Sequence, residues 1–331
     1  MFEEIISIEN LLDAWEEFIC GKRWKYDVQI FSANLMENIL TLHTLLATYA
    51  YYHGSYQKFR ISDPKPRDIS KASVRDRLLH HAIHRILYPF FDKKFIADSF
   101  SCRLKKGTHK AIGRFRSFAY QVSRNNTRTC WVLKCDIRKF FASIDHQILM
   151  GVLSKYIQDT NTAWLLGRVI DSFSSSRMGI GLPLGNLTSQ LFVNIYMNEF
   201  DQFVKHKLKV KYYLRYADDF VVFSHDKDWL AELLPRIGNF LQKRLNLDLH
   251  PNKVSIKTIA SGIDFLGWVH FTDHRVLRTV TKRRMFAKIK KNPTDVTLAS
   301  YLGMLRWGNT EKLIQAVRYL PTTIIRRQLL T

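Results

Sequence analysis

Two adjacent carboxylates stand between apolar, β-prone arms in the segment Tyr212–Ser224, which reads YYLRYADDFVVFS. This pattern predicts a β-hairpin with Asp218 and Asp219 at its tip. Neighbouring carboxylates among apolar residues are costly unless a cation neutralises them, and oxygen ligands of this kind suit Mg²⁺. An ordinary Asp-rich turn is the simpler interpretation, since Asp favours turns, but the Tyr- and Val-rich arms argue against it.

A third carboxylate, Asp136, ends the apolar strand expected over 130–136. Only tertiary structure can bring it to Asp218, because the two lie 82 positions apart. Acids at the ends of neighbouring strands fit phosphoryl transfer with two metal ions, which activate a 3′-hydroxyl and stabilise the pyrophosphate that leaves. Asp145 has a simpler role, because it directly precedes a helical pattern and is expected to be a helix N-cap.

The glycine-rich segment 179–190, GIGLPLGNLTSQ, leads into a helix expected over 186–207. Gly185 and Ser189 lie four residues apart, so we expect them on one helical face. Small residues there would let a base pair approach the backbone closely. Taken alone, the segment is equally typical of an ordinary helix start.

The elements around these segments predict an α+β fold, because hairpins and helices do not alternate as in a doubly wound sheet. Near the N-terminus we expect helices at 8–19, 31–49 and 74–90, with a strand–loop–strand unit over 51–73. Further along we expect helices at 113–124, 145–157, 161–173 and 227–246, a hairpin at 210–224, a β-rich stretch at 252–272 and a basic helical end.

The composition indicates a polyanionic partner. The chain has 331 residues, with 51 Lys and Arg against 29 Asp and Glu, a formal charge of +22. Nucleic acid is favoured over an anionic membrane because no apolar run approaches the roughly 18 residues of a span, and the acidic start lacks the order of a signal peptide. Four scattered cysteines without a CxxC pair argue against disulfides and structural zinc, so a cytoplasmic setting is expected. His80, His81 and His84 share a helix but lack further ligands in metal spacing.

Together, the YADD hairpin, Asp136 and the helix start at 181–194 resemble the reverse transcriptase family over roughly residues 50–310. The resemblance implies a right-hand polymerase with fingers, an antiparallel palm sheet that carries the YADD hairpin, and a helical thumb. We therefore expect a helical N-terminal extension over 1–50, fingers and palm over 51–272, and a basic helical thumb over 273–331. The role of the extension stays open, with template RNA or an accessory protein as the hypothesis.

A finer pattern narrows the resemblance. Many bacterial reverse transcriptases read QGxxxSP at the nucleotide-binding helix, whereas this chain reads LGNLTSQ over 184–190. That sequence resembles the reverse transcriptases of diversity-generating retroelements, as do the segments at 62–70, 76–82, 106–109 and 301–309. The resemblance implies an enzyme that copies a template-repeat RNA into cDNA with errors at template adenines.

The resemblance also implies roles for individual residues. Asp136, Asp218 and Asp219 would hold two Mg²⁺ ions, with Mn²⁺ as an alternative. The residues expected to bind the incoming nucleotide are Lys65, Arg67, Phe141, Leu184, Gly185 and Gln190. Phe141 would exclude a 2′-hydroxyl, while the adjacent Phe140 is expected in the core. Leu184 stands where accurate relatives have Gln, and the loss of that amide is expected to lower fidelity.

The segment 275–291 holds eight basic residues in seventeen, with apolar residues between them. A thumb helix that follows a nucleic-acid backbone needs such density, although a solvated basic face is the simpler interpretation. The thumb residues expected to contact phosphates are Arg275, Arg278, Lys282, Arg283, Arg284 and Lys288. The implied partners are template RNA, the cDNA or primer strand, dNTPs and a small basic helical oligomeric accessory protein.

Two alternatives stay open at this point. A retron-like or phage-defence reverse transcriptase would use the same chemistry, but Leu184 and Gln190 argue against the retron form. A catalytically inactive RNA-binding scaffold would not need three costly clustered acids, so the intact aspartates argue against it.

Overall fold

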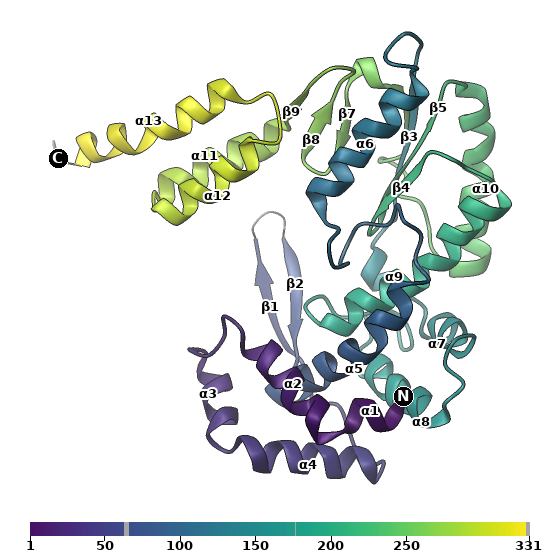
Figure 1. The fold of residues 1–331 in the computed structure, drawn as a ribbon, viewed down its shortest axis with the longest axis vertical. Helices are drawn as coiled ribbons and strands as arrows, with labels where there is room; N and C mark the ends of the chain where they lie inside the picture. Colours follow the sequence, from purple (N-terminus) through teal and green to yellow (C-terminus); the bar gives the residue numbers. More distant parts are fainter. Residues whose placement is uncertain (63–65, 176, 329–331) are drawn as a thin grey trace.

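The computed structural model describes residues 1–62, 66–175 and 177–328, with side chains described up to 319. Its longest axis runs from a group of N-terminal helices at one end to the palm sheet at the other (Figure 1). The thumb helices project from the palm end, and a long β-hairpin reaches toward them from the opposite side (Figure 1).

The N-terminal extension consists of α1 (Phe2–Ile6), α2 (Ile8–Ile19), α3 (Tyr26–Ala33) and α4 (Leu35–Ala47). The Ser7 side chain accepts a hydrogen bond from the Asn10 amide and so caps the N-terminus of α2. The single helix expected over 31–49 is wrong: the chain breaks at Asn34, between α3 and α4. Trp15 is buried, whereas Trp24 is 69% exposed.

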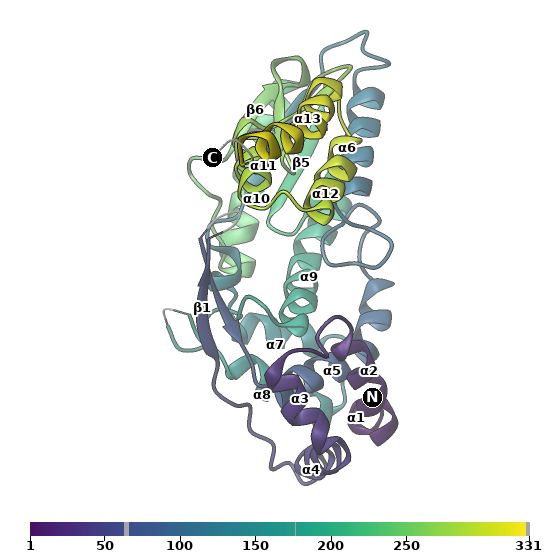
Figure 2. The ribbon, with the colours of Figure 1, turned by 90° about the vertical axis from the view of Figure 1, so that its left-hand side faces the viewer.

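The expected strand–loop–strand unit is a hairpin of β1 (Gln57–Ile61) and β2 (Arg67–Lys71), paired antiparallel with Phe59 opposite Ile69. It is followed by α5 (Val74–Asp92), which begins where the Ser73 side chain accepts from the Asp76 amide. Helix α2 packs along α5, so the extension lies against the fingers helix (Figure 1 and Figure 2).

The palm is a four-stranded sheet in the order β4–β5–β3–β6, with every neighbour antiparallel. Its strands are β3 (Trp131–Asp136), β4 (Tyr213–Tyr216), β5 (Asp219–Ser224) and β6 (Ser255–Thr258). Alternate side chains of a strand face opposite sides of a sheet. Val132 therefore packs toward α6 (Thr108–Val122), while Leu133 packs toward α9 (Leu187–Gln202) and α10 (Lys227–Leu245).

Two shorter helices, α7 (His146–Ser154) and α8 (Thr160–Asp171), pack beside α9 and complete the region around the palm. Asp145 accepts hydrogen bonds from the amides of Gln147 and Ile148, which confirms it as the N-cap of α7. Cys130 and Cys135 are buried thiols without a disulfide. These elements confirm the expected α+β class with an antiparallel palm sheet.

The C-terminal part begins with a three-stranded sheet of β7 (Ile263–Phe265), β8 (Trp268–His270) and β9 (Arg275–Leu277). The helices α11 (Thr279–Lys291), α12 (Asp295–Leu305) and α13 (Glu311–Gln328) follow. The β-rich stretch therefore extends to Leu277, beyond the expected end at 272. A separate small core of Trp268, Leu277, Met285, Ile289, Leu305 and Val317 joins the sheet to these helices.

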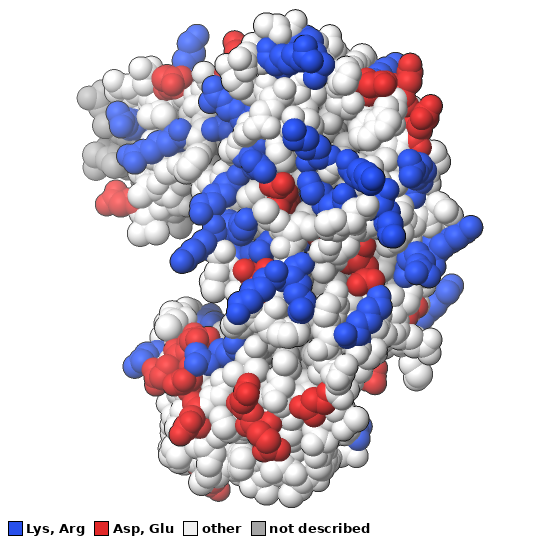
Figure 3. Space-filling model, turned by 45° about the vertical axis from the view of Figure 1, so that its right-hand side comes forward, with Lys and Arg blue, Asp and Glu red and all other residues white. Residues whose placement is uncertain are grey.

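Charge is divided between the two ends of the molecule. The first 50 residues carry eight acidic and only three basic side chains, so the positive excess lies in the rest of the chain. Figure 3 shows Lys and Arg over most of the visible face and acidic side chains gathered at the lower end, over the N-terminal helices. No helix within the described residues is both long enough and apolar enough to cross a bilayer.

Candidate active site

The palm sheet brings the three aspartates together. Asp136 and Asp219 lie directly opposite each other in the pairing of β3 with β5, and Asp219 also pairs with Tyr216 on β4. Asp218 occupies the tight turn between β4 and β5, next to Ala217, whose φ is +54°. The register of one sheet thus joins two carboxylates that the sequence separates widely.

The electrostatics of this cluster favour a bound cation. Burial raises the pKa of Asp219 to about 6, and the carboxylates of Asp218 and Asp136 add to the rise. Burial and the Asp136 carboxylate likewise raise the pKa of Asp218. Raised acid pKa values mean that negative charge here is undercompensated, which is the condition that a divalent cation relieves.

One cation of the chain already contacts the cluster. The Lys253 ammonium donates a hydrogen bond of 2.9 Å to Oδ1 of Asp136, and its side chain is 43% exposed. Sequence reasoning missed Lys253, because nothing near it in the chain marks it as a partner of a distant aspartate. The ammonium therefore competes with a metal ion for Oδ1 of Asp136.

The donor set fits Mg²⁺ in its chemistry, since three carboxylates supply only oxygen ligands. Among the residues that the structure describes, no three His, Cys, Asp or Glu side chains are already arranged to hold a metal ion. Asp136, Asp218 and Asp219 are nevertheless the residues that would hold it, with Lys253 displaced. When bound, the ions would supply activation of a 3′-hydroxyl and stabilisation of pyrophosphate.

The turn at Leu184 and Gly185 packs against the fingers hairpin. The Ser70 amide of β2 donates a hydrogen bond of 3.1 Å to the Leu184 carbonyl. Gly185 has a φ of +122°, and a Cβ there would lie 3.2 Å from Cγ2 of Ile69. Because α9 begins only at Leu187, the expectation that Gly185 shares a helical face with Ser189 is wrong. Glycine is required at this position because the turn is left-handed and because β2 leaves little room for a Cβ.

Gln190 lies in the first turn of α9 and borders a cavity of about 340 Å³. The cavity lies between the fingers hairpin, α2, α5 and the start of α9, and Phe59, Ile69 and Gly185 also line it. The structure therefore groups Leu184, Gly185 and Gln190 on the wall shared by fingers and palm.

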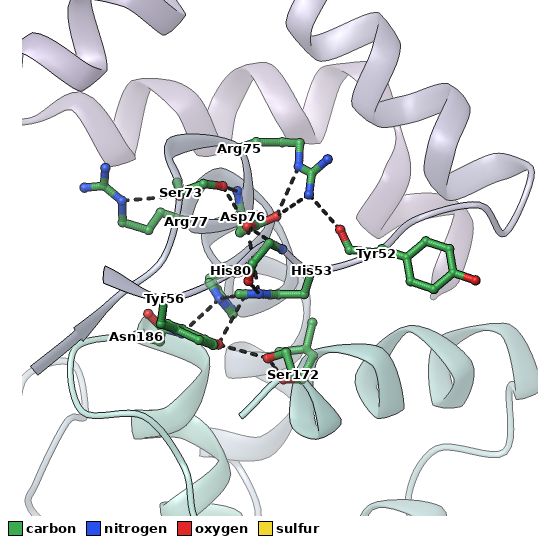
Figure 4. Close-up of polar contacts among 12 residues, drawn as sticks. Tyr52, His53, Tyr56, Ser73, Arg75, Asp76, Arg77, His80, Ser172 and Asn186 are labelled. Atoms are coloured by element: carbon green, nitrogen blue, oxygen red, sulfur yellow. Dashed lines mark hydrogen bonds and ion pairs between the residues drawn. The ribbon is translucent and has the colours of Figure 1, made fainter. Parts of the chain in front are cut away.

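A buried polar network holds the start of α9 against α5 (Figure 4). The Asn186 amide donates to Nε2 of His80 at 3.1 Å, and the Thr188 hydroxyl shares a 2.7 Å hydrogen bond with Nδ1 of the same ring. His80 in turn contacts His53, ring nitrogen to ring nitrogen, at 3.2 Å. Burial lowers the pKa of His80 to about 3, so the ring is neutral and works as a structural hydrogen-bond centre.

The same network reaches the N-terminus of α5 through Asp76, which is fully buried. Its carboxylate accepts hydrogen bonds from the Tyr51 hydroxyl, the Gly54 amide and the Ser73 hydroxyl, at 3.0, 3.0 and 2.6 Å. The sequence argued against a metal site at the histidine cluster, but it did not predict that His80 and Asp76 form a buried hydrogen-bond network. The network fixes the loop that precedes α9 from behind.

The remaining nucleotide-site candidates lie as follows. Phe140 is buried, as expected, and Phe141 is half-buried beside it. The Leu182 amide donates to the Phe141 carbonyl at 2.8 Å, which ties Phe141 to the segment before Leu184. Arg67 begins β2 and lies near enough to Asp218 to lower its pKa, against the larger effect of burial. Lys65 lies outside the described residues.

Two of the thumb residues expected to contact phosphates, Arg275 and Arg278, form bonds within the chain. Arg275 lies in β9 and donates to the Trp307 carbonyl, and Arg278 forms a 2.9 Å ion pair with Asp264. The expectation of one basic helix over the whole segment is therefore wrong. The other four candidates, Lys282, Arg283, Arg284 and Lys288, lie on α11.

With this geometry in place, the family is clear from sequence comparison. The model of the reverse transcriptase (RNA-dependent DNA polymerase) family matches residues 60–270, and the chain belongs to that family. The expectation of an RNA-directed DNA polymerase is confirmed at this level, and enzymes of this family generally use divalent metal ions.

Curated relatives include intron-encoded proteins. Protein YkfC of Escherichia coli K12 is 25% identical over 269 residues, covering 69% of this chain and 67% of its own. The group II intron-encoded protein LtrA of Lactococcus lactis is 23% identical over 328 residues, covering 77% of this chain and 52% of its own. This chain thus spans about half the length of LtrA.

Solved structures show the same fold. Apo telomerase from Candida tropicalis superposes with a TM-score of 0.53 at 11% identity, covering 89% of this chain and 63% of that one. Its complex with a fragment of telomeric RNA superposes with a TM-score of 0.51 at 12% identity, covering 87% of this chain and 57% of that one. These similarities confirm the arrangement of fingers, palm and thumb expected from the sequence.

Proposed function

We propose that this chain is the polymerase of a diversity-generating retroelement, which copies a template-repeat RNA into cDNA with errors concentrated at template adenines. The observation that carries the subtype is Leu184. Its carbonyl is held by Ser70, and its half-buried side chain has no polar atom to offer an incoming base. One missing hydrogen bond corresponds to about 1 kcal/mol, or about fivefold in discrimination.

In the proposed reaction Asp136, Asp218 and Asp219 hold two Mg²⁺ ions, which supply the chemistry described above. Arg67, opposite Ile61 at the turn end of the fingers hairpin, binds the triphosphate through charge-assisted hydrogen bonds. Phe141 excludes a 2′-hydroxyl sterically and so selects dNTPs. The α11 cations contact the phosphates of template and primer without reading sequence.

The basic surface supports RNA and primer as partners, since a large positive excess binds polyanions in a salt-dependent way. A small basic helical oligomeric accessory protein is proposed from the resemblance alone. Because both proteins would be positive, the template RNA would join them. Adding salt to the reconstituted complex should release both proteins from the RNA together.

Primer extension on an RNA template tests the proposal, with purified protein, dNTPs, Mg²⁺ and sequencing of the product. We expect cDNA with errors at template adenines, and a Leu184→Gln variant with fewer of them. Accurate cDNA from the wild type would favour the retron-like or phage-defence alternative. The absence of any product, even with a cognate structured RNA and partner, would favour an RNA-binding scaffold.

A further inference from the structure

Arg215 is a fully buried cation two residues before the turn that carries Asp218. Its side chain is 0% exposed, and it lies on β4, an edge strand of the palm sheet, against α9. A buried charge of this kind is tolerated only when its hydrogen bonds are satisfied. The five N–H groups of its guanidinium therefore have to be accounted for one by one.

All five N–H groups have an acceptor. The Nε–H group and one N–H group of Nη2 donate to the two carboxylate oxygens of Asp201, at 2.8 and 2.7 Å. The second N–H group of Nη2 donates to the Ser99 hydroxyl at 3.1 Å. Nη1 donates to Oδ1 of Asn194 at 3.3 Å and to the carbonyl of Ala217 at 3.1 Å.

The bond to Ala217 reaches the catalytic turn itself. Ala217 has a φ of +54°, a left-handed conformation that residues with a Cβ disfavour. Its carbonyl is held by Arg215, and the next residue in the chain is Asp218. The direction in which the Asp218 carboxylate leaves the turn thus depends on a peptide group that Arg215 holds in place.

Two of the other partners, Asp201 and Asn194, belong to α9. Asp201 and Asn194 are both buried residues of this helix, and the Tyr213 hydroxyl of β4 also donates to Asp201, at 2.7 Å. The N-terminus of α9 follows the Leu184–Gly185 turn. One guanidinium therefore connects the catalytic turn to the helix that begins at the nucleotide site.

We propose that Arg215 is a positioning residue of the polymerase: it holds the main chain of Ala217 so that the Asp218 carboxylate faces Asp136, and it fixes this turn to α9. Arg215 does not touch the reacting atoms. The proposal rests on the metal-binding role proposed above for Asp218. Lysine cannot replace it, because an ammonium offers three donors from one point and cannot span Asp201 and Ala217 together.

The test uses the full chain with two variants. Arg215→Lys keeps the charge and removes the planar fork. The double variant Arg215→Met with Asp201→Asn removes both buried charges together, and Asn still offers an acceptor to Tyr213, so that folding does not depend on an unpaired ion. Asp218→Asn serves as the reference for a lost metal ligand.

Arg103 offers a matched control. Its side chain is 6% exposed and forms an ion pair with Asp92 at 2.7 Å. It also donates hydrogen bonds to the carbonyls of Ile96 and Ser99, at 2.7 and 3.1 Å. It has no hydrogen bond to the YADD turn. Arg103→Met therefore removes a buried ionic arginine without touching the main chain of Ala217.

Three quantities are measured: Mn²⁺ binding by electron paramagnetic resonance, kcat and KM for dNTP in primer extension, and the midpoint of thermal unfolding. We expect Arg215→Lys and the double variant to bind Mn²⁺ about tenfold more weakly and to lose about 100-fold in kcat, with KM within threefold. Arg103→Met should lose thermal stability while Mn²⁺ binding and kcat stay within twofold.

The proposal is overturned if either Arg215 variant folds and keeps wild-type Mn²⁺ binding and kcat, because the pair would then contribute stability alone. It is also overturned if Arg103→Met lowers Mn²⁺ binding and kcat as much as the Arg215 variants do. If Asp218→Asn binds Mn²⁺ like the wild type, the metal role proposed for Asp218 fails instead, and this outcome is distinct from the other two.

Discussion

Replacing Asp219 with Asn should stabilise the metal-free protein at neutral pH while it abolishes polymerisation. The reason is the cost of ionising a buried carboxyl beside two others. Burial, with Asp218 and Asp136 adding to it, raises the pKa of Asp219 from 3.8 to about 6 in the folded chain. An Asn side chain occupies nearly the same volume and carries no charge.

The sign follows from proton binding. The folded state holds the Asp219 proton more tightly than the unfolded state, so the free energy of unfolding falls as the pH rises from about 4 to about 6. A shift of about two pKa units corresponds to about 3 kcal/mol. Solvent screening at this partly exposed side chain reduces the expected gain of Asp219→Asn to about 1–2 kcal/mol at pH 7.5, equivalent to a few degrees in Tm.

The assay is thermal unfolding followed by circular dichroism in EDTA, at pH 7.5 and pH 4.5. The variant should unfold at a higher temperature than the wild type at pH 7.5, and the difference should shrink at pH 4.5. Saturating Mg²⁺ should remove or reverse the gain, because only the wild type offers the full set of carboxylates.

Asp159 provides a control with the opposite sign. Hydrogen bonds from the Thr162 side chain and from the amides of Phe2, Thr162 and Asn161 lower its pKa, so its ionised form stabilises the fold. Asp159→Ala should therefore lower the free energy of unfolding at pH 7.5 by about 1 kcal/mol, the usual contribution of a helix cap, and so lower Tm. This loss of stability should diminish as the pH falls. If the control behaves so while Asp219→Asn is no more stable than the wild type in EDTA at pH 7.5, the electrostatic reasoning fails.

Three further substitutions test the rest of the site. Gly185→Ala should raise KM for dNTP severalfold in primer extension, because residue 185 has a positive φ and the added Cβ contacts the fingers strand. Its control is Gly113→Ala on α6, where the Cβ enters open space and the free energy of unfolding should rise by up to about 1 kcal/mol. His80→Phe should cost about 2–4 kcal/mol in urea unfolding, because its hydrogen-bond partners stay buried and unpaired; an unchanged midpoint would contradict this. Lys253→Met should tighten Mn²⁺ binding without nucleotide, measured by electron paramagnetic resonance, since the ammonium no longer competes for Asp136; weaker binding would contradict it.

The YADD hairpin and the strand that ends at Asp136 could be predicted because their signals are local. A continuous run of apolar residues, Phe220 to Phe223, defines β5, and a tight turn with Asp218 separates it from β4. The opposition of Asp136 and Asp219 is different in kind. It depends on the register of strands distant in sequence, and only the resemblance to a family suggested that the carboxylates meet.

Local patterns failed where tertiary contacts decide the boundaries. Gly185 has the spacing of a helical residue, but the hydrogen bond of its neighbour Leu184 to β2 holds the chain in a turn, and α9 begins only at Leu187. Arg275 has the spacing of a basic helix, but pairing of β9 with β8 draws it into a sheet. In both places a partner distant in sequence outweighs the helical propensity of the segment.

The buried polar residues were the hardest to predict, although the sequence gives a signal for one of them, Arg215. An arginine between Leu214 and Tyr216, in the middle of a strand of apolar residues, is costly unless a carboxylate meets it. That signal predicts a partner but not which one, and Asp201 lies on a separate element. His80 left a weaker trace, since a histidine on a helix is ordinary until its neighbours are known.

The acidic N-terminal extension has a structural role that its charge makes clear. Asp13 pairs with Arg85 of α5 at 2.8 Å, and Asp27 pairs with Lys71 of β2 and Arg77 of α5, at 2.7 and 2.5 Å. The extension therefore neutralises the rear of the fingers and ties β2 to α5 from behind. A face with an excess of acids repels a phosphate backbone, so we expect a bound nucleic acid to avoid the outer face of this extension.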